Sequence, residues 1–159
     1  MIENKIKNIL SLRNLVLRLK KQRKKIVFTN GCFDILHYGH VKYLEDAKKK
    51  GDILIVGINS DSSIKRIKGP KRPLVNEKDR MRILAALESV TYTCLFKEAT
   101  PINLIKAIKP HTLIKGADWD KGKIVGADFV KSYGGKVFTI PLVKDRSTTK
   151  IIEKISQRF

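Results

Sequence analysis

The 159-residue sequence contains only two cysteines, Cys32 and Cys94. So few thiols exclude a fold held together by several disulfides, and the spacing of the two is not that of a paired metal motif. Proline and glycine are also scarce, at 5 and 10 residues, whereas 42% of the residues are hydrophobic. This composition excludes a collagen-like, mucin-like or intrinsically disordered chain. We expect one compact domain in a reducing cytoplasm.

Long apolar runs are absent too. The longest extends from Ile53 to Ile58, far short of the roughly 20 residues that a membrane-spanning helix needs. The N-terminus alternates charged and apolar residues and lacks the unbroken apolar segment of a signal peptide. We therefore expect a soluble protein without a membrane partner.

Acidic residues are outnumbered: 15 Asp and Glu stand against 34 Lys and Arg, which gives a formal net charge of +19. A charge of this size suits binding to nucleic acid, to an anionic membrane surface or to a multiply phosphorylated small molecule. It is equally typical of a lysine-rich surface without a specific target. Because the basic residues are spread over the whole chain and aromatic residues make up only 7%, the charge alone does not decide between these classes.

Apolar residues follow two periods along the chain. Short apolar runs predict buried strands at residues 26–29, 53–58, 90–96, 112–114 and 136–140. Helical spacing predicts helices at residues 41–50, 76–88, 101–108 and 128–133. A first helix is predicted from one apolar stripe, formed by Leu12, Leu15, Val16 and Leu19. A last helix is expected to bury the face that carries Ile151, Ile152 and Ile155.

Strands that alternate with helices predict an α/β fold with a single doubly wound, Rossmann-like parallel sheet. We expect this domain to occupy residues 26–159, with the basic helix of residues 1–25 packed on it. Ligands of such sheets bind beyond the carboxyl ends of the strands, where helix N-termini also point. This rule selects three places in advance: the loop after the first predicted strand, the loop after the fourth, and the start of the last helix.

The first of these loops contains the tetrapeptide His37-Tyr38-Gly39-His40. Gly39 allows close approach of the backbone, and the two imidazoles can donate hydrogen bonds to phosphoryl oxygens at a helix N-terminus. Zinc is the competing ligand, but the sequence has only one other histidine, His111, and no thiol beside it. We therefore expect no metal bound by the protein itself.

The string Gly31-Cys32-Phe33-Asp34 followed by HxGH resembles the signature of the HxGH nucleotidyltransferases, the cytidylyltransferase-like superfamily. In that family the histidines contact the phosphates of a nucleoside triphosphate, and a second motif, rich in Ser and Thr, opens the last helix. Arg146 and residues 147–150, Ser-Thr-Thr-Lys, stand at that place here. Their hydroxyls, the free N–H groups of the helix and the guanidinium form an anion site by their chemistry alone.

The resemblance extends over nearly the whole chain to one branch of the family. Its members transfer AMP from ATP to D-glycero-β-D-manno-heptose 1-phosphate, for lipopolysaccharide core synthesis, and many are fused to a sugar kinase. The strings at residues 27–34, 56–61, 65–70, 115–118 and 125–130 carry it. The given sequence has no kinase half and so resembles the stand-alone form. Trp119 stands where the branch usually has Tyr, which keeps an aromatic ring but loses a hydroxyl.

The resemblance implies a role for each matching residue. Candidates for catalysis are His37, His40, Lys42 and Arg146. Candidates for binding ATP are Asn30, Gly31, Cys32, Phe33, Asp34, Gly39, Lys115, Gly116, Asp118, Ser147, Thr148 and Thr149. Candidates for binding the sugar phosphate are Asn59, Asp61, Lys65, Lys68, Arg72 and Trp119. Mg²⁺ would arrive with ATP, and Asp34 would either touch that ion or orient a neighbour.

Three other functions remain open at this stage. One is a related nucleotidyltransferase that uses glycerol 3-phosphate with CTP, or FMN with ATP. The second is a basic nucleic-acid-binding module, although retention of both phosphate motifs leads us to expect no nucleic-acid partner. The third is a sensor that binds nucleotide without turnover.

Since members of the family commonly dimerise, the resemblance also implies a homodimer.

Overall fold

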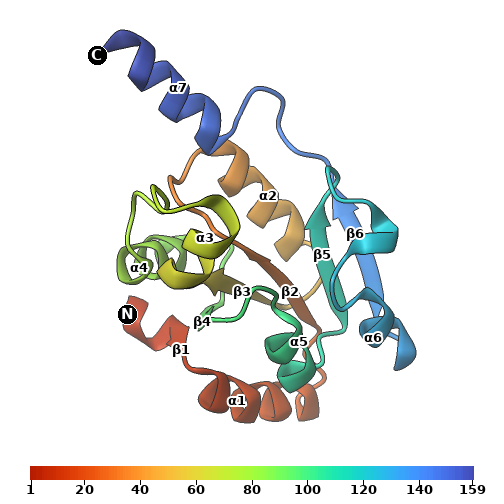
Figure 1. The fold of residues 1–159 in the computed structure, drawn as a ribbon. Helices are drawn as coiled ribbons and strands as arrows, with labels where there is room; N and C mark the ends of the chain where they lie inside the picture. The colour runs from red at the N-terminus through yellow and green to blue at the C-terminus, as the bar shows by residue number, and fades with distance from the viewer.

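The computed structural model describes residues 1–159, apart from the side chain of Lys121, and consists of one six-stranded sheet flanked by helices (Figure 1). The strands are β1 (Ile6–Lys7), β2 (Ile26–Gly31), β3 (Ile53–Asn59), β4 (Tyr92–Phe96), β5 (Thr112–Gly116) and β6 (Lys136–Ile140). The α-helices are α1 (Ile9–Lys21), α2 (Tyr38–Lys48), α3 (Asp61–Lys68), α4 (Glu77–Ala86), α5 (Ile102–Ile108), α6 (Ala127–Ser132) and α7 (Thr148–Arg158). Short 3₁₀ turns lie at Ile2–Lys5 and Lys121–Lys123.

The strand order is β1-β4-β3-β2-β5-β6, and every neighbouring pair is parallel. The chain adds β3 and β4 on one side of β2 and then crosses to add β5 and β6 on the other. The sheet topology therefore changes direction at β2, where a doubly wound sheet binds its ligands. The predicted α/β fold with a doubly wound parallel sheet is confirmed.

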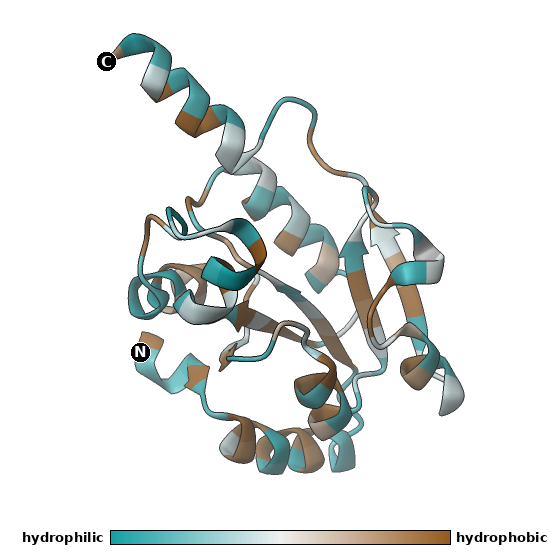
Figure 2. Ribbon diagram, viewed as in Figure 1, coloured by the Kyte–Doolittle hydropathy of each residue, from teal (hydrophilic) through white to brown (hydrophobic). Residues whose placement is uncertain are grey.

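Two apolar cores explain why the strands are nearly continuous in hydrophobic residues. Along β3, Leu54, Val56 and Ile58 face a core shared with α2 and α4, whereas Ile55 faces a core shared with α1, α5 and α6. Successive side chains of a strand point to opposite faces, so a strand covered on both sides has no polar face. Figure 2 shows the central strands as largely hydrophobic.

The helix α1 packs against the sheet beside α5. Asn8 is its N-cap, and the Asn8 side chain accepts a hydrogen bond from the Ser11 N–H at 2.8 Å. Leu12 and Val16 are buried in the core beside α5. Among the described residues, no helix is both long and apolar enough to cross a membrane.

Several elements differ from the prediction. The edge strand β1 and the helix α3 were not expected, and Pro101 is the N-cap of α5 instead of lying in its first turn. The predicted buried face of the last helix is wrong. α7 has no fully buried residue, Ile155 is 53% exposed, and the helix projects away from the sheet (Figure 1). Only its first turn reaches the rest of the domain, so its isoleucines have no core to enter.

Candidate active site

A cavity of about 310 Å³ opens at the carboxyl ends of the central strands. Its walls are the loop after β2, the loop after β5 and the start of α7, the three places that the sheet topology selects, together with the segment between α3 and α4. The residues that line it are Asn30, Gly31, Cys32, Phe33, Asp34, His37, Gly39, His40, Tyr43, Lys68, Arg72, Lys115, Gly116, Asp118, Trp119, Leu142, Val143, Arg146, Ser147, Thr148 and Thr149.

The two histidines of the first loop lie against each other. The ring centroids of His37 and His40 are 3.8 Å apart, with an angle of 24° between the ring planes. His37 is the N-cap of α2 but its side chain caps nothing. The Nδ1 atoms of both rings are buried without a hydrogen-bond partner among the described residues. Buried polar atoms are normally satisfied, so these two identify a place for a polar ligand.

Both imidazoles are uncharged at neutral pH. Burial, together with the positive charges of His37 and Lys68, lowers the pKa of His40 to about 4. Burial and the nearby Arg146 also lower the pKa of His37 below its usual value. The rings therefore offer neutral hydrogen-bond donors. A bound anion would favour their charged forms and so bind more tightly.

Two helix N-termini converge beside these rings. A Cβ atom added at Gly39 in α2 would lie 3.0 Å from the His37 ring and 3.1 Å from Arg146 Cβ, so any side chain here would push these neighbours apart. Ser147 caps α7 by accepting a hydrogen bond from the Lys150 N–H at 3.1 Å, and the Thr148 hydroxyl donates to the Ile35 carbonyl at 3.4 Å. Free N–H groups, hydroxyls and a guanidinium together suit a chain of phosphates.

The wall that follows β5 combines a buried cation with an aromatic ring. Lys115 is 7% exposed, and its ammonium lies 4.9 Å from the Trp119 ring centroid and 3.4 Å from the Asn30 carbonyl oxygen. Burial lowers the pKa of Lys115 to about 8. Trp119 is 46% exposed, and the apolar side chains of Leu142 and Val143 also line the cavity. A flat aromatic surface with apolar neighbours suits a nucleobase.

The opposite wall is the segment between α3 and α4, residues 69–76, and Asp34 attaches it to the loop after β2. Asp34 Oδ1 accepts hydrogen bonds from the N–H groups of Leu74 and Val75 at 2.8 and 2.9 Å, and Oδ2 accepts one from Arg72 Nε at 2.6 Å. Burial alone would raise the pKa of Asp34, but these contacts outweigh it and the pKa is lowered.

Arg80 of α4 makes a second attachment between the same two regions. It is 1% exposed and donates from Nε to the Val75 carbonyl at 2.9 Å, from Nη1 to the Cys32 carbonyl at 2.7 Å, and from Nη2 to Asp61 Oδ1 at 2.8 Å. A buried guanidinium with a partner for each of its three nitrogens holds its neighbours in fixed positions.

Four of the predicted site residues lie outside the cavity. Lys42 forms an ion pair with Asp46 at 2.6 Å on α2. Asn59 is buried and donates to the Ser63 hydroxyl at 3.1 Å, and Asp61 pairs with Arg80. Lys65 is exposed on α3 and lines a separate hollow with the start of α4. The geometry gives no support to a binding or catalytic role for these four.

Three cavity residues were not predicted. Tyr43 lies one turn after His40 on α2, and its hydroxyl is 2.7 Å from that of Thr29. The helical spacing of three residues from His40 was a usable signal. Leu142 and Val143 lie between β6 and the second motif, in a segment with no recognisable pattern.

Among the described residues, no group of three or more His, Cys, Asp or Glu side chains is placed so that it could hold a metal ion.

The chain is similar to known proteins over nearly its whole length. Residues 28–154 match the cytidylyltransferase-like family model. The bifunctional protein HldE of Trichlorobacter lovleyi is 51% identical over 99% of this chain, and that of Geobacter metallireducens is 52% identical over 98%. The chain spans 32% of the length of each.

Solved structures agree with the fold. The lipopolysaccharide core biosynthesis protein of Thermoplasma volcanium has a TM-score of 0.63 and 30% identity, covering 77% of this chain and 99% of its own. A pantoate-β-alanine ligase of Francisella tularensis, with a TM-score of 0.56 over 97% of this chain and 79% of its own but 17% identity, shares the fold alone. The sequence-based prediction of a nucleotidyltransferase is thus confirmed at the level of the family. The chain, with its HxGH loop and the start of α7 on one cavity, belongs to the cytidylyltransferase-like family.

Proposed function

We propose that this protein transfers AMP from ATP to D-glycero-β-D-manno-heptose 1-phosphate, and that it supplies ADP-heptose for lipopolysaccharide core synthesis in the cytoplasm. The observation that carries the proposal is the convergence of two neutral imidazoles, the N-termini of α2 and α7 and Arg146 on one cavity. Identity of about 50% to the HldE proteins over almost the whole chain, and the lipopolysaccharide core protein among the similar structures, support this choice of acceptor.

The reaction needs positioning and charge stabilisation more than proton transfer. An anomeric phosphate oxygen attacks the α-phosphorus of ATP, an O–P bond forms, and the bond to the β-phosphate oxygen breaks, so that pyrophosphate leaves with the electron pair. The attacking phosphate is already ionised at neutral pH, so no general base is required. The enzyme holds two anions in line and stabilises the charge that develops.

The residues of the cavity divide between these tasks. His37 and His40 donate hydrogen bonds to the oxygens of the α-phosphate. Arg146 and the Ser147–Thr149 turn hold the outer phosphates. Trp119 and Lys115 lie on the nucleoside side, and Lys68 and Arg72 face the acceptor.

A divalent cation would be carried by the nucleotide. The cavity has two carboxylates, Asp34 and Asp118, and the oxygens of Asp34 already accept three N–H groups. Mg²⁺ keeps several waters and commonly binds through phosphates with one or two carboxylates, so Asp118 with the triphosphate fits it. The ion would neutralise charge on the phosphates.

We also propose a homodimer that forms through α7. Ile151 and Ile152 of this helix are half-buried in the single chain, and Ile155 is 53% exposed. A second copy of the same helix offers the matching apolar face, and closed two-fold pairs are the commonest assemblies. Analytical ultracentrifugation of the wild type and of the Ile155→Lys variant tests this: a dimer that becomes a monomer is expected, and a monomeric wild type contradicts it.

Pyrophosphate release tests the proposed reaction. The purified protein is incubated with Mg²⁺ and either ATP or CTP, each paired with heptose 1-phosphate, glycerol 3-phosphate or FMN. Release only with ATP and the β-heptose phosphate supports the proposal. Release with another pair replaces the substrate while keeping the reaction class. No release with any pair contradicts turnover, and nucleotide-binding and nucleic-acid titrations then separate a sensor from a nucleic-acid-binding module.

A further inference from the structure

Arg72 lines the active-site cavity and carries a donor that the described residues leave without a partner. Asp34 fixes its Nε atom, and the side chain is 16% exposed, but its Nη2 atom is buried without a hydrogen-bond partner among the described residues. Buried donors of charged groups rarely go unpaired, because the loss of water is not compensated. A donor of this kind on a cavity wall fits an oxyanion, and the planar edge of a guanidinium suits a phosphate best.

The position of Arg72 indicates which phosphate it receives. Arg72 follows β3 and α3 in the chain, whereas Lys115 and Trp119 follow β5, and β3 and β5 flank β2 on opposite sides. The aromatic and apolar side chains that suit a nucleoside are on the β5 side. In a displacement at phosphorus the attacking and leaving oxygens are roughly in line, so the acceptor must approach from a side that the nucleotide does not occupy. With the nucleoside on the β5 side, the β3 side of the cavity is left for the acceptor.

Asp34 determines where the Arg72 side chain lies. The carboxylate holds Arg72 itself and the backbone on the far side of Pro73, through Leu74 and Val75. Arg80 holds the Val75 carbonyl from the other direction. Asp34 is 3% exposed and accepts three N–H groups, so its oxygens are largely engaged by donors of the protein.

We infer that Asp34 is a positioning residue that fixes the 69–76 segment and holds the Arg72 guanidinium at the cavity wall, where it binds the phosphate of the acceptor. The inference rests on the proposed transfer reaction for the identity of the acceptor. The sequence left two roles open for Asp34, contact with Mg²⁺ and orientation of a neighbouring residue. The two can be distinguished, because loss of the negative charge would change the Mg²⁺ requirement only in the first case.

Steady-state kinetics with Asp34→Asn, Arg72→Gln and Lys71→Gln test the inference. Asp34→Asn keeps the size of the side chain but weakens the contact to Arg72. Lys71 is an exposed cation on the same segment that does not line the cavity, so Lys71→Gln is the matched control for charge. We expect the KM for the sugar phosphate to rise at least about tenfold in Asp34→Asn and Arg72→Gln, with the KM for ATP changed less than about threefold. Lys71→Gln should resemble the wild type.

Two further readouts separate the anchor from its alternatives. The Mg²⁺ concentration for half-maximal activity should be the same in Asp34→Asn as in the wild type, whereas a metal ligand predicts a large increase. The double variant Asp34→Asn/Arg72→Gln should bind the sugar phosphate little worse than Arg72→Gln alone, because Asp34 acts on the acceptor through the Arg72 guanidinium. A parallel rise in the KM for ATP, a shifted Mg²⁺ requirement or additive losses would each overturn the inference.

The anchor is also measurable without any substrate. Hydrogen exchange at the Leu74 and Val75 amides should accelerate in Asp34→Asn and stay slow in Arg72→Gln, which keeps the carboxylate. Unchanged exchange in Asp34→Asn contradicts the anchor whatever the enzyme's substrate. Should Asp34→Asn fail to fold, Arg72→Gln alone tests the contact to the acceptor. Failure of the proposed reaction would appear separately, as absent pyrophosphate release in the wild type.

Discussion

At the scale of single residues, the stacked histidines show how burial prepares a phosphate site. His37 and His40 are held neutral by burial and by neighbouring positive charge. Neutral rings placed this close repel each other less than two imidazolium ions would. They nevertheless remain donors fixed in position before the ligand arrives, so little reorganisation is needed at the moment of reaction.

Replacing His40 tests this arrangement. In His40→Ala one fixed donor to the reacting phosphate is lost, and such a loss costs on the order of 100–1,000-fold in kcat. Thermal unfolding should change little in comparison, because His40 lies on a cavity wall. Tyr38→Ala serves as the control, since Tyr38 lies in the same first turn of α2 but is 58% exposed and does not line the cavity. Activity of His40→Ala within about threefold of the wild type would refute the proposed role.

The pKa of His40 also predicts how stability depends on pH. Its folded-state pKa of about 4 is below the value of 6.5 of a free imidazole, so between these values the unfolded chain binds more protons. The free energy of unfolding should therefore fall as the pH drops from about 6.5 to about 4. Urea unfolding across this range checks it, and His40→Gln, which cannot titrate, should lose this part of the slope. An equal slope in both proteins would contradict the shift.

At the scale of elements, α1 stabilises the domain through one face only. Leu12 is fully buried beside α5, whereas Leu17 on the same helix is 52% exposed. Leu12→Ala should lower the free energy of unfolding by about 2–5 kcal/mol, the usual result of a cavity in a core. Leu17→Ala should change it by less than about 0.5 kcal/mol. Chemical denaturation measures both, and equal effects would show that α1 does not pack as described.

The elements that were predicted are those with strong apolar periodicity. β2, β3, β4 and β5 and the helices α1, α2, α4 and α6 each carry two or more buried residues, whereas β6 buries only Ile140. β1 has only two residues and is a strand because it pairs with β4. This pairing is distant in sequence, so no local pattern predicts it. α3 has a single buried apolar residue, Ile64, so its apolar pattern was too weak to recognise.

The same argument explains the predicted site residues. Loops at strand ends follow from topology, so the residues after β2 and β5 and at the start of α7 were placed correctly in the cavity. Lys42 was misplaced because two positions beyond His40 correspond to about 200° around a helix, nearly the opposite face. Arg72 of the 69–76 segment lines the cavity because of contacts that are distant in sequence, from Asp34 to Arg72 and from Arg80 to the Cys32 carbonyl. No periodicity encodes such contacts.

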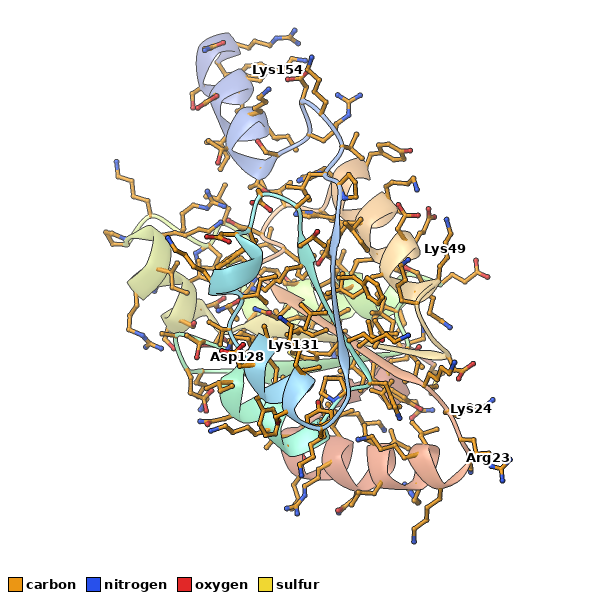
Figure 3. The ribbon with its side chains drawn as sticks, turned by 90° about the vertical axis from the view of Figure 1, so that its right-hand side faces the viewer. Arg23, Lys24, Lys49, Asp128, Lys131 and Lys154 are labelled. Carbon is orange, nitrogen blue, oxygen red and sulfur yellow. The ribbon has the colours of Figure 1, made fainter. Side chains whose placement is uncertain are left out.

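At the scale of the whole molecule, the positive charge surrounds the domain instead of gathering at the cavity. Arg23, Lys24 and Lys49 lie on one side of the molecule and Lys154 on the projecting helix α7 (Figure 3). Lys25, Lys49, Lys50 and Lys136 line a second hollow at the amino ends of the strands. A domain with a net charge of +19 attracts anionic substrates from every direction.

Salt should therefore slow the capture of ATP. Screening shortens the range of charge interactions from about 10 Å at 0.1 M salt to about 3 Å at 1 M. We expect kcat/KM for ATP to fall steadily over this range while kcat changes little, because steering acts on encounter and not on chemistry. Measurements at constant free Mg²⁺ in a salt series check this. A flat kcat/KM would mean that the surface charge plays no part in capture.

The projecting position of α7 has a consequence for how the enzyme turns over. Thr148 and Thr149 at its first turn line the cavity, but none of its side chains is fully buried. Tilting the helix about residues 141–147 would therefore leave the core covered, and local opening of this kind costs far less than global unfolding. The groups proposed to hold the outer phosphates lie at its first turn, so in the proposed dimer the contact between the two α7 helices would limit this motion and with it the release of pyrophosphate.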